Sequence, residues 1–130
     1  MPFIVLLLIL VTRVGLAADL PNGTWRVSEI AVDLYPCQQA ACGKIVWLEN
    51  PAQRHFCGRV IIWGLMRDGG SSEWNGGWFY NPKDDTTYNL KANVDNNDRI
   101  TARIYRGITL LGRTEILTRI KSHSLAGWCR

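Results

Sequence analysis

The clearest alternation in the sequence lies in "TYNLKANVDNNDRITARIY", residues 87–105. Its apolar side chains recur at every second position on both sides of a polar "DNND": Tyr88, Leu90, Ala92, Val94, then Ile100, Ala102 and Ile104. A period of two is that of a β-strand with one buried face, and Asp and Asn favour turns. The stretch therefore predicts an antiparallel hairpin with one face in a core and the other in water.

The same period recurs through the rest of the chain, in short runs separated by Pro, Gly, Asn and Asp. The predicted strands cover residues 23–29, 30–36, 43–49, 59–65, 73–81, 85–94, 99–106 and 112–121. A chain of 130 residues has room for one domain. Eight consecutive strands with short connections predict an all-β, up-and-down antiparallel barrel, because closure removes exposed sheet edges. A Greek-key barrel or sandwich is the alternative.

The N-terminus carries an apolar run from Pro2 to Val11, followed by small residues up to Ala18. This order predicts a secretory signal peptide over residues 1–18 and a single barrel domain over residues 19–130. An uncleaved anchor is the alternative, but the run is shorter than the roughly 20 residues that a spanning helix needs. We therefore expect a periplasmic or secreted protein.

Four cysteines form an even set in a chain expected to enter an oxidising compartment. Cys37 and Cys42 flank a turn between two strand-like runs, so a bond between them would clamp a hairpin. Cys57 with Cys129 then follows by elimination. Zinc is the rival interpretation, but neither a C-x-x-C motif nor a His pair supplies ligand spacing. We predict two disulfides and no metal.

The first strand opens with Gly23-Thr24-Trp25, which is similar to the G-x-W that starts lipocalin and avidin barrels. In those barrels the Trp closes one end and a basic residue of the last strand lies over it. Arg119 occupies the matching place. The resemblance thus implies that Trp25 is buried beneath Arg119, a cation–π arrangement worth roughly 1 kcal/mol.

A longer resemblance covers nearly all of residues 22–120. Its motifs are "GTW" (23–25), "CGKIVWL" (42–48), "CG" (57–58), "WNGGWFYNP" (74–82) and "GRTEILTRI" (112–120). Together they are similar to an exported bacterial family, domain of unknown function 2147. The resemblance implies a lipocalin-like barrel and no established activity. The chain departs from the family in a shortened connection, "ENPAQRHF", before Cys57.

The aromatic segment "EWNGGWFYNP", residues 73–82, has two interpretations. Strict alternation would put one set of residues on one face: Trp74, Gly76, Trp78 and Tyr80. The adjacent glycines suggest a bulge or bend where a neighbouring side chain needs room. The structural interpretation is core packing. The functional one is that Trp78 and Tyr80, with Trp47 or Trp63, line a lumenal pocket for a small hydrophobic or aromatic ligand.

Residues that could support catalysis are scarce. His55 and His123 stand apart from any Ser or Cys arrangement, and paired cysteines would leave no thiol nucleophile. We therefore predict that the protein is not an enzyme and uses no cofactor.

The net charge of +4 is spread among acids, which argues against a nucleic-acid partner. Basic residues on the last two predicted strands would form a stripe if they lay side by side, although ordinary solubilising charge explains them too. Two functions remain. The first is a barrel that binds a small hydrophobic or aromatic molecule. The alternative is an envelope module with a filled interior, whose outer surface docks a protein or anionic lipid.

Overall fold

The computed structural model describes residues 22–121 and 128–129. The expected signal peptide, residues 1–18, lies outside this range. Within it, eight strands and two short 3-10 helices follow one another along the chain. They are β1 (Gly23–Val27), β2 (Ile30–Cys37), β3 (Ala40–Leu48), η1 (Pro51–Phe56), β4 (Val60–Arg67), β5 (Glu73–Asn81), β6 (Thr86–Asn96), β7 (Arg99–Tyr105), η2 (Thr109–Leu111) and β8 (Arg113–Arg119).

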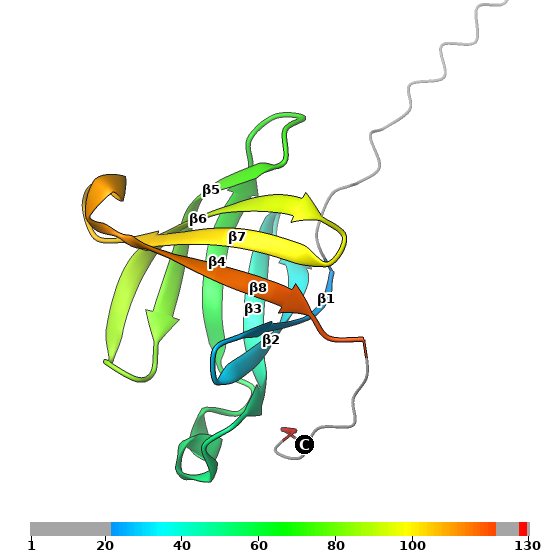
Figure 1. Cartoon of the computed structure of the whole chain (residues 1–130), viewed down its shortest axis with the longest axis vertical. Coiled ribbons are helices and arrows are strands. Elements are labelled where there is room, and N and C mark those ends of the chain that lie inside the picture. Colours follow the sequence, from blue (N-terminus) through cyan, green and yellow to red (C-terminus); the bar gives the residue numbers. More distant parts are fainter. Residues whose placement is uncertain (1–21, 122–127, 130) are drawn as a thin grey trace, which may run out of the picture.

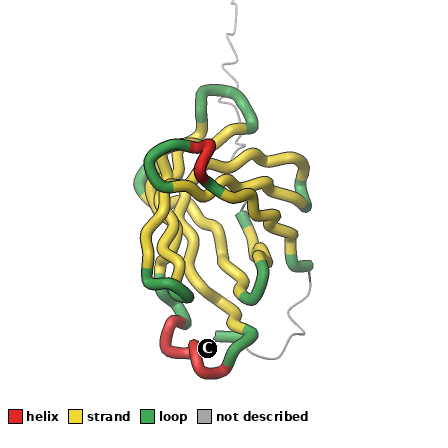
Figure 2. Tube along the Cα trace, turned by 60° about the vertical axis from the view of Figure 1, so that its left-hand side comes forward, coloured by secondary structure: helices red, strands yellow, loops and turns green. Residues whose placement is uncertain are grey.

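The strands close into a barrel in simple chain order (Figures 1 and 2). Each strand pairs antiparallel with the next, and β1 pairs with β8 through Trp25 opposite Arg119. The up-and-down barrel expected from the strand pattern is therefore confirmed, and the Greek-key alternative is wrong. In the described part of the chain, no helix has the length and apolarity needed to cross a membrane.

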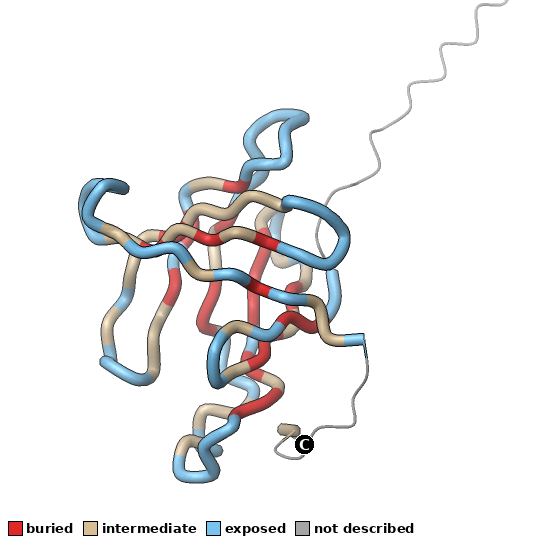
Figure 3. The backbone as a smooth tube through the Cα atoms, viewed as in Figure 1, coloured by how far each residue is buried: buried red, intermediate tan, exposed pale blue. Residues whose placement is uncertain are grey.

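The hairpin of β6 and β7 has the register that its alternation predicts. Leu90 pairs with Ile104 and Ala92 with Ala102, and all four side chains face the interior. Buried residues concentrate on the strands, whereas the turns at both ends are exposed (Figure 3). The core therefore lies inside the barrel.

The two ends of the barrel differ. The N-terminus of β1 and the β2–β3, β4–β5 and β6–β7 turns meet at one end, here called the floor. The β1–β2 turn, η1, the β5–β6 turn and η2 meet at the other, here called the mouth.

Trp25 and Arg119 seal the floor, as the G-x-W resemblance implied. Trp25 is completely buried, and the Arg119 guanidinium carbon lies 4.4 Å from its ring centroid. Arg119 also donates hydrogen bonds to the carbonyls of Asn22 (2.7 Å) and Asn97 (2.5 Å). Gly23 has a φ of 116°, and a Cβ there would collide with the Arg119 guanidinium. One cation therefore ties together three chain segments at the floor.

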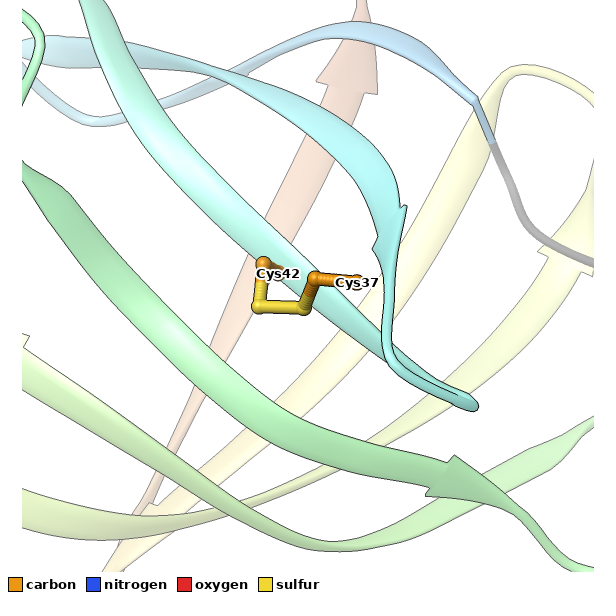
Figure 4. Close-up of a disulfide and its surroundings, with 2 residues drawn as sticks. All are labelled: Cys37 and Cys42. Atoms are coloured by element: carbon orange, nitrogen blue, oxygen red, sulfur yellow. A yellow bond between two sulfur atoms is a disulfide. The ribbon is translucent and has the colours of Figure 1, made fainter.

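Both expected disulfides are present. Cys37–Cys42 closes the β2–β3 turn at the floor (Figure 4). Its central residues, Gln38 and Gln39, have φ values of 53° and 54°, the left-handed geometry of a two-residue hairpin turn. Cys57–Cys129 joins the segment after η1 to the C-terminus. All four thiols are thus engaged, which leaves none of them to bind zinc.

A bulge in β5 reverses the expected alternation. Trp74 pairs with Ala92 and Gly77 with Leu90, so β5 advances by three residues where β6 advances by two. Gly76, within this interval, has a φ of 71°. Trp74, Gly77 and Phe79 therefore point inward and Trp78 points outward. The side chain that needs room is Leu65, since a Cβ on Gly77 would lie 2.8 Å from its Cδ1. The sequence correctly suggested a bulge, but strict alternation put Trp78 on the face of Trp74, whereas in the structure Phe79 shares the interior with Trp74.

Candidate ligand-binding site

The barrel interior contains a cavity of about 50 Å³, here called the chamber. Its walls come from every strand: Val27, Leu34, Ala41, Ile62, Leu65, Trp74, Phe79, Leu90, Ala92, Val94, Ile100, Ala102, Ile104, Glu115 and Leu117. One water needs roughly 10–15 Å³ on this measure of volume, so the chamber exceeds the size of a single water site. Its walls are aliphatic and aromatic except for one carboxylate.

The chamber exists because several inward positions carry very small side chains. An eight-stranded barrel is just filled by side chains of ordinary size. Ala92 and Ala102 face each other on β6 and β7, Ala41 lines the wall on β3, and Gly77 contributes no side chain on β5. Trp74 and Phe79 do not fill the space that these residues leave.

A larger hollow of about 360 Å³ opens above the chamber at the mouth. Val27, Phe79, Ile104 and Glu115 line both spaces, so the hollow and the chamber adjoin. The hollow is additionally lined by polar residues of the turns, of η1 and of the adjoining strand ends: Ser28, Glu29, Gln53, Asn81, Lys83, Asp84 and Arg113. An apolar chamber below a polar entrance is the arrangement that suits an amphiphilic ligand.

Charged and phenolic groups form a connected rim where the two spaces meet. Glu115 carries the only charge among the chamber-lining residues of the described chain, and its Oε1 lies 3.2 Å from Arg113 Nε. Arg113 lies 6.0 Å from the ring centroid of Tyr88. The Tyr88 hydroxyl donates to the Asp84 carboxylate, and this hydrogen bond is the main cause that raises the pKa of Tyr88. The rim therefore offers groups of both charges to a polar ligand end.

The four residues proposed from sequence as ligand walls do not line the chamber. Trp78 is 43% exposed and pairs with the half-buried Trp63 across β5 and β4. Trp78 belongs to the outer face because the bulge at Gly76 changes the parity of β5, and its partner Trp63 lies on the same face. The prediction that they face the lumen is wrong.

Tyr80 and Trp47 are also outside the chamber lining, each with a different environment. The Arg59 guanidinium lies 4.2 Å from the Tyr80 ring centroid, and the Tyr80 hydroxyl donates to Asp85 at 2.6 Å, which raises its pKa. Trp47 is buried under Arg26, at 4.9 Å, and bridges to Trp128. These contacts are structural and place neither ring against the lumen.

The residues that sequence reasoning missed are Trp74, Phe79 and Glu115. The glycine pair 76–77 was the available signal for the aromatics, because a bulge there exchanges the two faces of β5. Glu115 follows from the register with β7, since its partner Ala102 faces inward.

The basic residues of the last two strands do not form a stripe. Arg103 lies on the outer face and binds the carbonyls of η2, whereas Arg113 reaches the mouth and Arg119 the floor. They are separated because Ile104 pairs with Arg113, which puts Arg113 on the inward face of β8.

The closed barrel with its sealed floor defines a lipocalin-like fold. A solved structure shares this fold: a protein of Helicobacter pylori, HP1028, described as belonging to the lipocalin family. It superposes with a TM-score of 0.64 at 17% identity, over 78% of this chain and 84% of that one. Residues 23–119 match the family described as uncharacterized protein conserved in bacteria (DUF2147), and the chain belongs to that family. No curated protein matches it.

Proposed function

We propose that the protein is a non-catalytic binding protein of the bacterial envelope that takes up a small hydrophobic or aromatic molecule. The observation that carries the proposal is the chamber, an apolar cavity that an ordinary set of core side chains would have filled. Two disulfides support an exported location, and the family match supports a bacterial protein. The lipocalin-family neighbour supports the fold alone.

The shape of the site suggests how a ligand would lie. As it stands, the chamber holds only the end of a short acyl chain, and an aromatic ring would enter it only if the turns of the mouth spread. The rest of the ligand would occupy the hollow, where the polar end meets the Arg113–Glu115 and Lys83–Glu29 ion pairs. Because both pairs are exposed to water, they cost little to rearrange around a head group.

The test uses N-phenyl-1-naphthylamine, an apolar dye whose fluorescence rises when it leaves water. We expect the wild type to bind it, and Ala102→Leu to weaken binding by at least about tenfold, because the added methyl groups occupy the chamber. Trp78→Ala removes a much larger side chain from the outer face and is expected to leave binding unchanged. Unchanged melting temperature would show that Ala102→Leu still folds.

Two results would contradict the proposal. Dye binding that Trp78→Ala abolishes and Ala102→Leu leaves intact would place the site on the outer wall. A wild type that binds neither the dye nor short-chain fatty acids or indoles would leave the chamber without a function.

A further inference from the structure

An exposed apolar group lies at the mouth, on the turn that joins β7 to β8. Ile108, Leu110 and Leu111 are 58%, 82% and 75% exposed, and we call these three residues the apolar tip. The turn projects from the barrel wall beside the mouth (Figure 1), and Figure 3 shows it as exposed. Leu110 is the most exposed large hydrophobic side chain in the described part of the chain.

The tip is held in place rather than loosely tethered. Arg103, on the outer face of β7, donates from Nε and Nη2 to the Thr109 carbonyl at 3.0 and 2.9 Å. It also reaches the Leu110 carbonyl at 3.4 Å and the Thr114 hydroxyl at 3.1 Å. One guanidinium therefore presents the tip in a fixed orientation.

These contacts and the bonds of the turn itself also satisfy three backbone carbonyls of the tip. The carbonyls of Ile108 and Thr109 accept from the amides of Leu111 and Gly112, each at 3.2 Å. With the Arg103 bonds, the carbonyls of Ile108, Thr109 and Leu110 all have internal partners. Insertion of backbone into an apolar medium requires such internal pairing, because each unsatisfied group costs several kcal/mol.

The charged residues of the segment that carries the tip all have one sign. Residues 103–113 contain Arg103, Arg106 and Arg113 and no acidic residue. Arg106 is exposed, and Arg113 is more than half exposed despite its contact with Glu115. Aliphatic side chains flanked by arginine are the combination that binds a membrane interface, where apolar groups enter the acyl boundary and cations meet anionic head groups.

We propose that the apolar tip docks the mouth of the barrel onto a lipid bilayer that carries anionic head groups. A protein partner fits less well, because a stable protein interface uses about 20–30 residues on each side and this projection offers three aliphatic ones. The proposal does not depend on what fills the chamber. Docking would place the mouth against the layer in which apolar ligands are most concentrated.

The experiment is co-sedimentation of the purified protein with sucrose-loaded vesicles. One set contains phosphatidylcholine alone, and the other contains phosphatidylcholine with phosphatidylglycerol. Wild type and variants share the same N-terminus, so any contribution from that segment cancels in the comparison. We expect wild type to bind the anionic vesicles, and added salt to weaken the binding.

The variants separate the apolar and charged contributions. Leu110→Ser/Leu111→Ser should weaken binding by at least about tenfold, because two side chains no longer leave water. Arg106→Gln should weaken binding to anionic vesicles by about fivefold, the value of one interfacial charge. Met66→Ser removes a 53% exposed apolar side chain near the floor and should have no effect.

Equal binding by wild type and the double Ser variant would overturn the proposal, as would failure of wild type to bind either vesicle. Equal binding to both vesicle types would overturn the role of anionic lipid. Self-association that the double variant abolishes, without vesicle binding, would assign the tip to a second copy of the chain. Dye binding by the double variant tests the chamber separately, so the two proposals can fail independently.

Discussion

The bulge at Gly76 and Gly77 determines which aromatic rings face the lumen. Substitution of either glycine should destabilise the protein, but for a different physical reason at each site. Gly77 faces inward, where a Cβ would lie 2.8 Å from Leu65 Cδ1 and 3.2 Å from Leu65 Cα. Gly76 has open space around it but a φ of 71°. The first glycine is therefore required by packing and the second by backbone conformation.

The magnitudes follow from these two causes. Overpacking costs about 1–3 kcal/mol, and replacing Gly by Ala returns about 0.4–1 kcal/mol by restricting the unfolded chain. We expect Gly77→Ala to lose about 1–2 kcal/mol in the free energy of unfolding. Gly76→Ala should lose about 1 kcal/mol, since a left-handed residue with a side chain costs about 1–2 kcal/mol. Gly70→Ala, which meets no atom within 4 Å, should be neutral or slightly stabilising.

Asparagine distinguishes the two sites, because it tolerates the left-handed region but is larger than alanine. Gly76→Asn should be milder than Gly76→Ala, and Gly77→Asn should be worse than Gly77→Ala. Urea unfolding followed by circular dichroism, with the disulfides intact, measures all the variants. A neutral Gly77→Ala would refute the inward position of Gly77, and with it the assignment of Trp78 to the outer face.

Three further outcomes are expected. Trp25→Ala should cost about 3–5 kcal/mol in urea unfolding, and Arg119→Ala less, because Trp25 is fully buried at the floor; a small loss on truncating Trp25 would contradict the sealed floor. Iodide should quench Trp78, which is 43% exposed, so Trp78→Phe should remove much of the quenchable emission; an unchanged quenching curve would show that Trp78 is shielded. A hydrogen bond from Thr101 is the main cause that lowers the pKa of Asp95. The ionised Asp95 carboxylate therefore stabilises the fold above its unfolded-state pKa of about 3.9, and this stabilisation is lost as the pH falls through its lower folded-state pKa. Asp95→Asn should therefore lower the melting temperature at pH 7 and have little effect near pH 2, and an equal loss at both pH values would rule out this linkage.

Regular alternation made the barrel predictable, and local departures from it hid the site. Residues 88–104 keep one parity on each strand, so the hairpin and its inner face could be derived directly. In β5 the single extra residue at the bulge exchanged the faces, and the sequence contains no second signal that says where the exchange occurs. Such an error leaves the predicted number and order of strands correct, but it makes the predicted ligand-lining residues wrong.

The chamber and the apolar tip depend on how the fold brings distant residues together, which no local sequence pattern indicates. Taken singly, each of the three lining alanines is an ordinary strand residue. Only closure of the barrel brings Ala41, Ala92 and Ala102 around one cavity. The tip "ITLLG" likewise lacks periodicity, and its exposure depends on the Arg103 hydrogen bonds that hold it away from the core. Sequence reasoning could therefore predict that a lumen exists, but not its size or its entrance.

The contacts at the floor are stronger than those that join the β1–β2 and β5–β6 turns at the mouth. At the floor, Arg119 joins three chain segments over a buried Trp25, and Cys37–Cys42 closes the adjacent turn. At the mouth, the Lys83–Glu29 and Arg113–Glu115 pairs are exposed, and pairs of that kind contribute at most about 1 kcal/mol each. Movement of the β1–β2 and β5–β6 turns, which the Lys83–Glu29 pair joins, would therefore disturb little of the free energy that keeps the barrel closed. Since the chamber is too small for most ligands as it stands, a mouth that can spread while the floor stays fixed is what such a barrel needs in order to admit one.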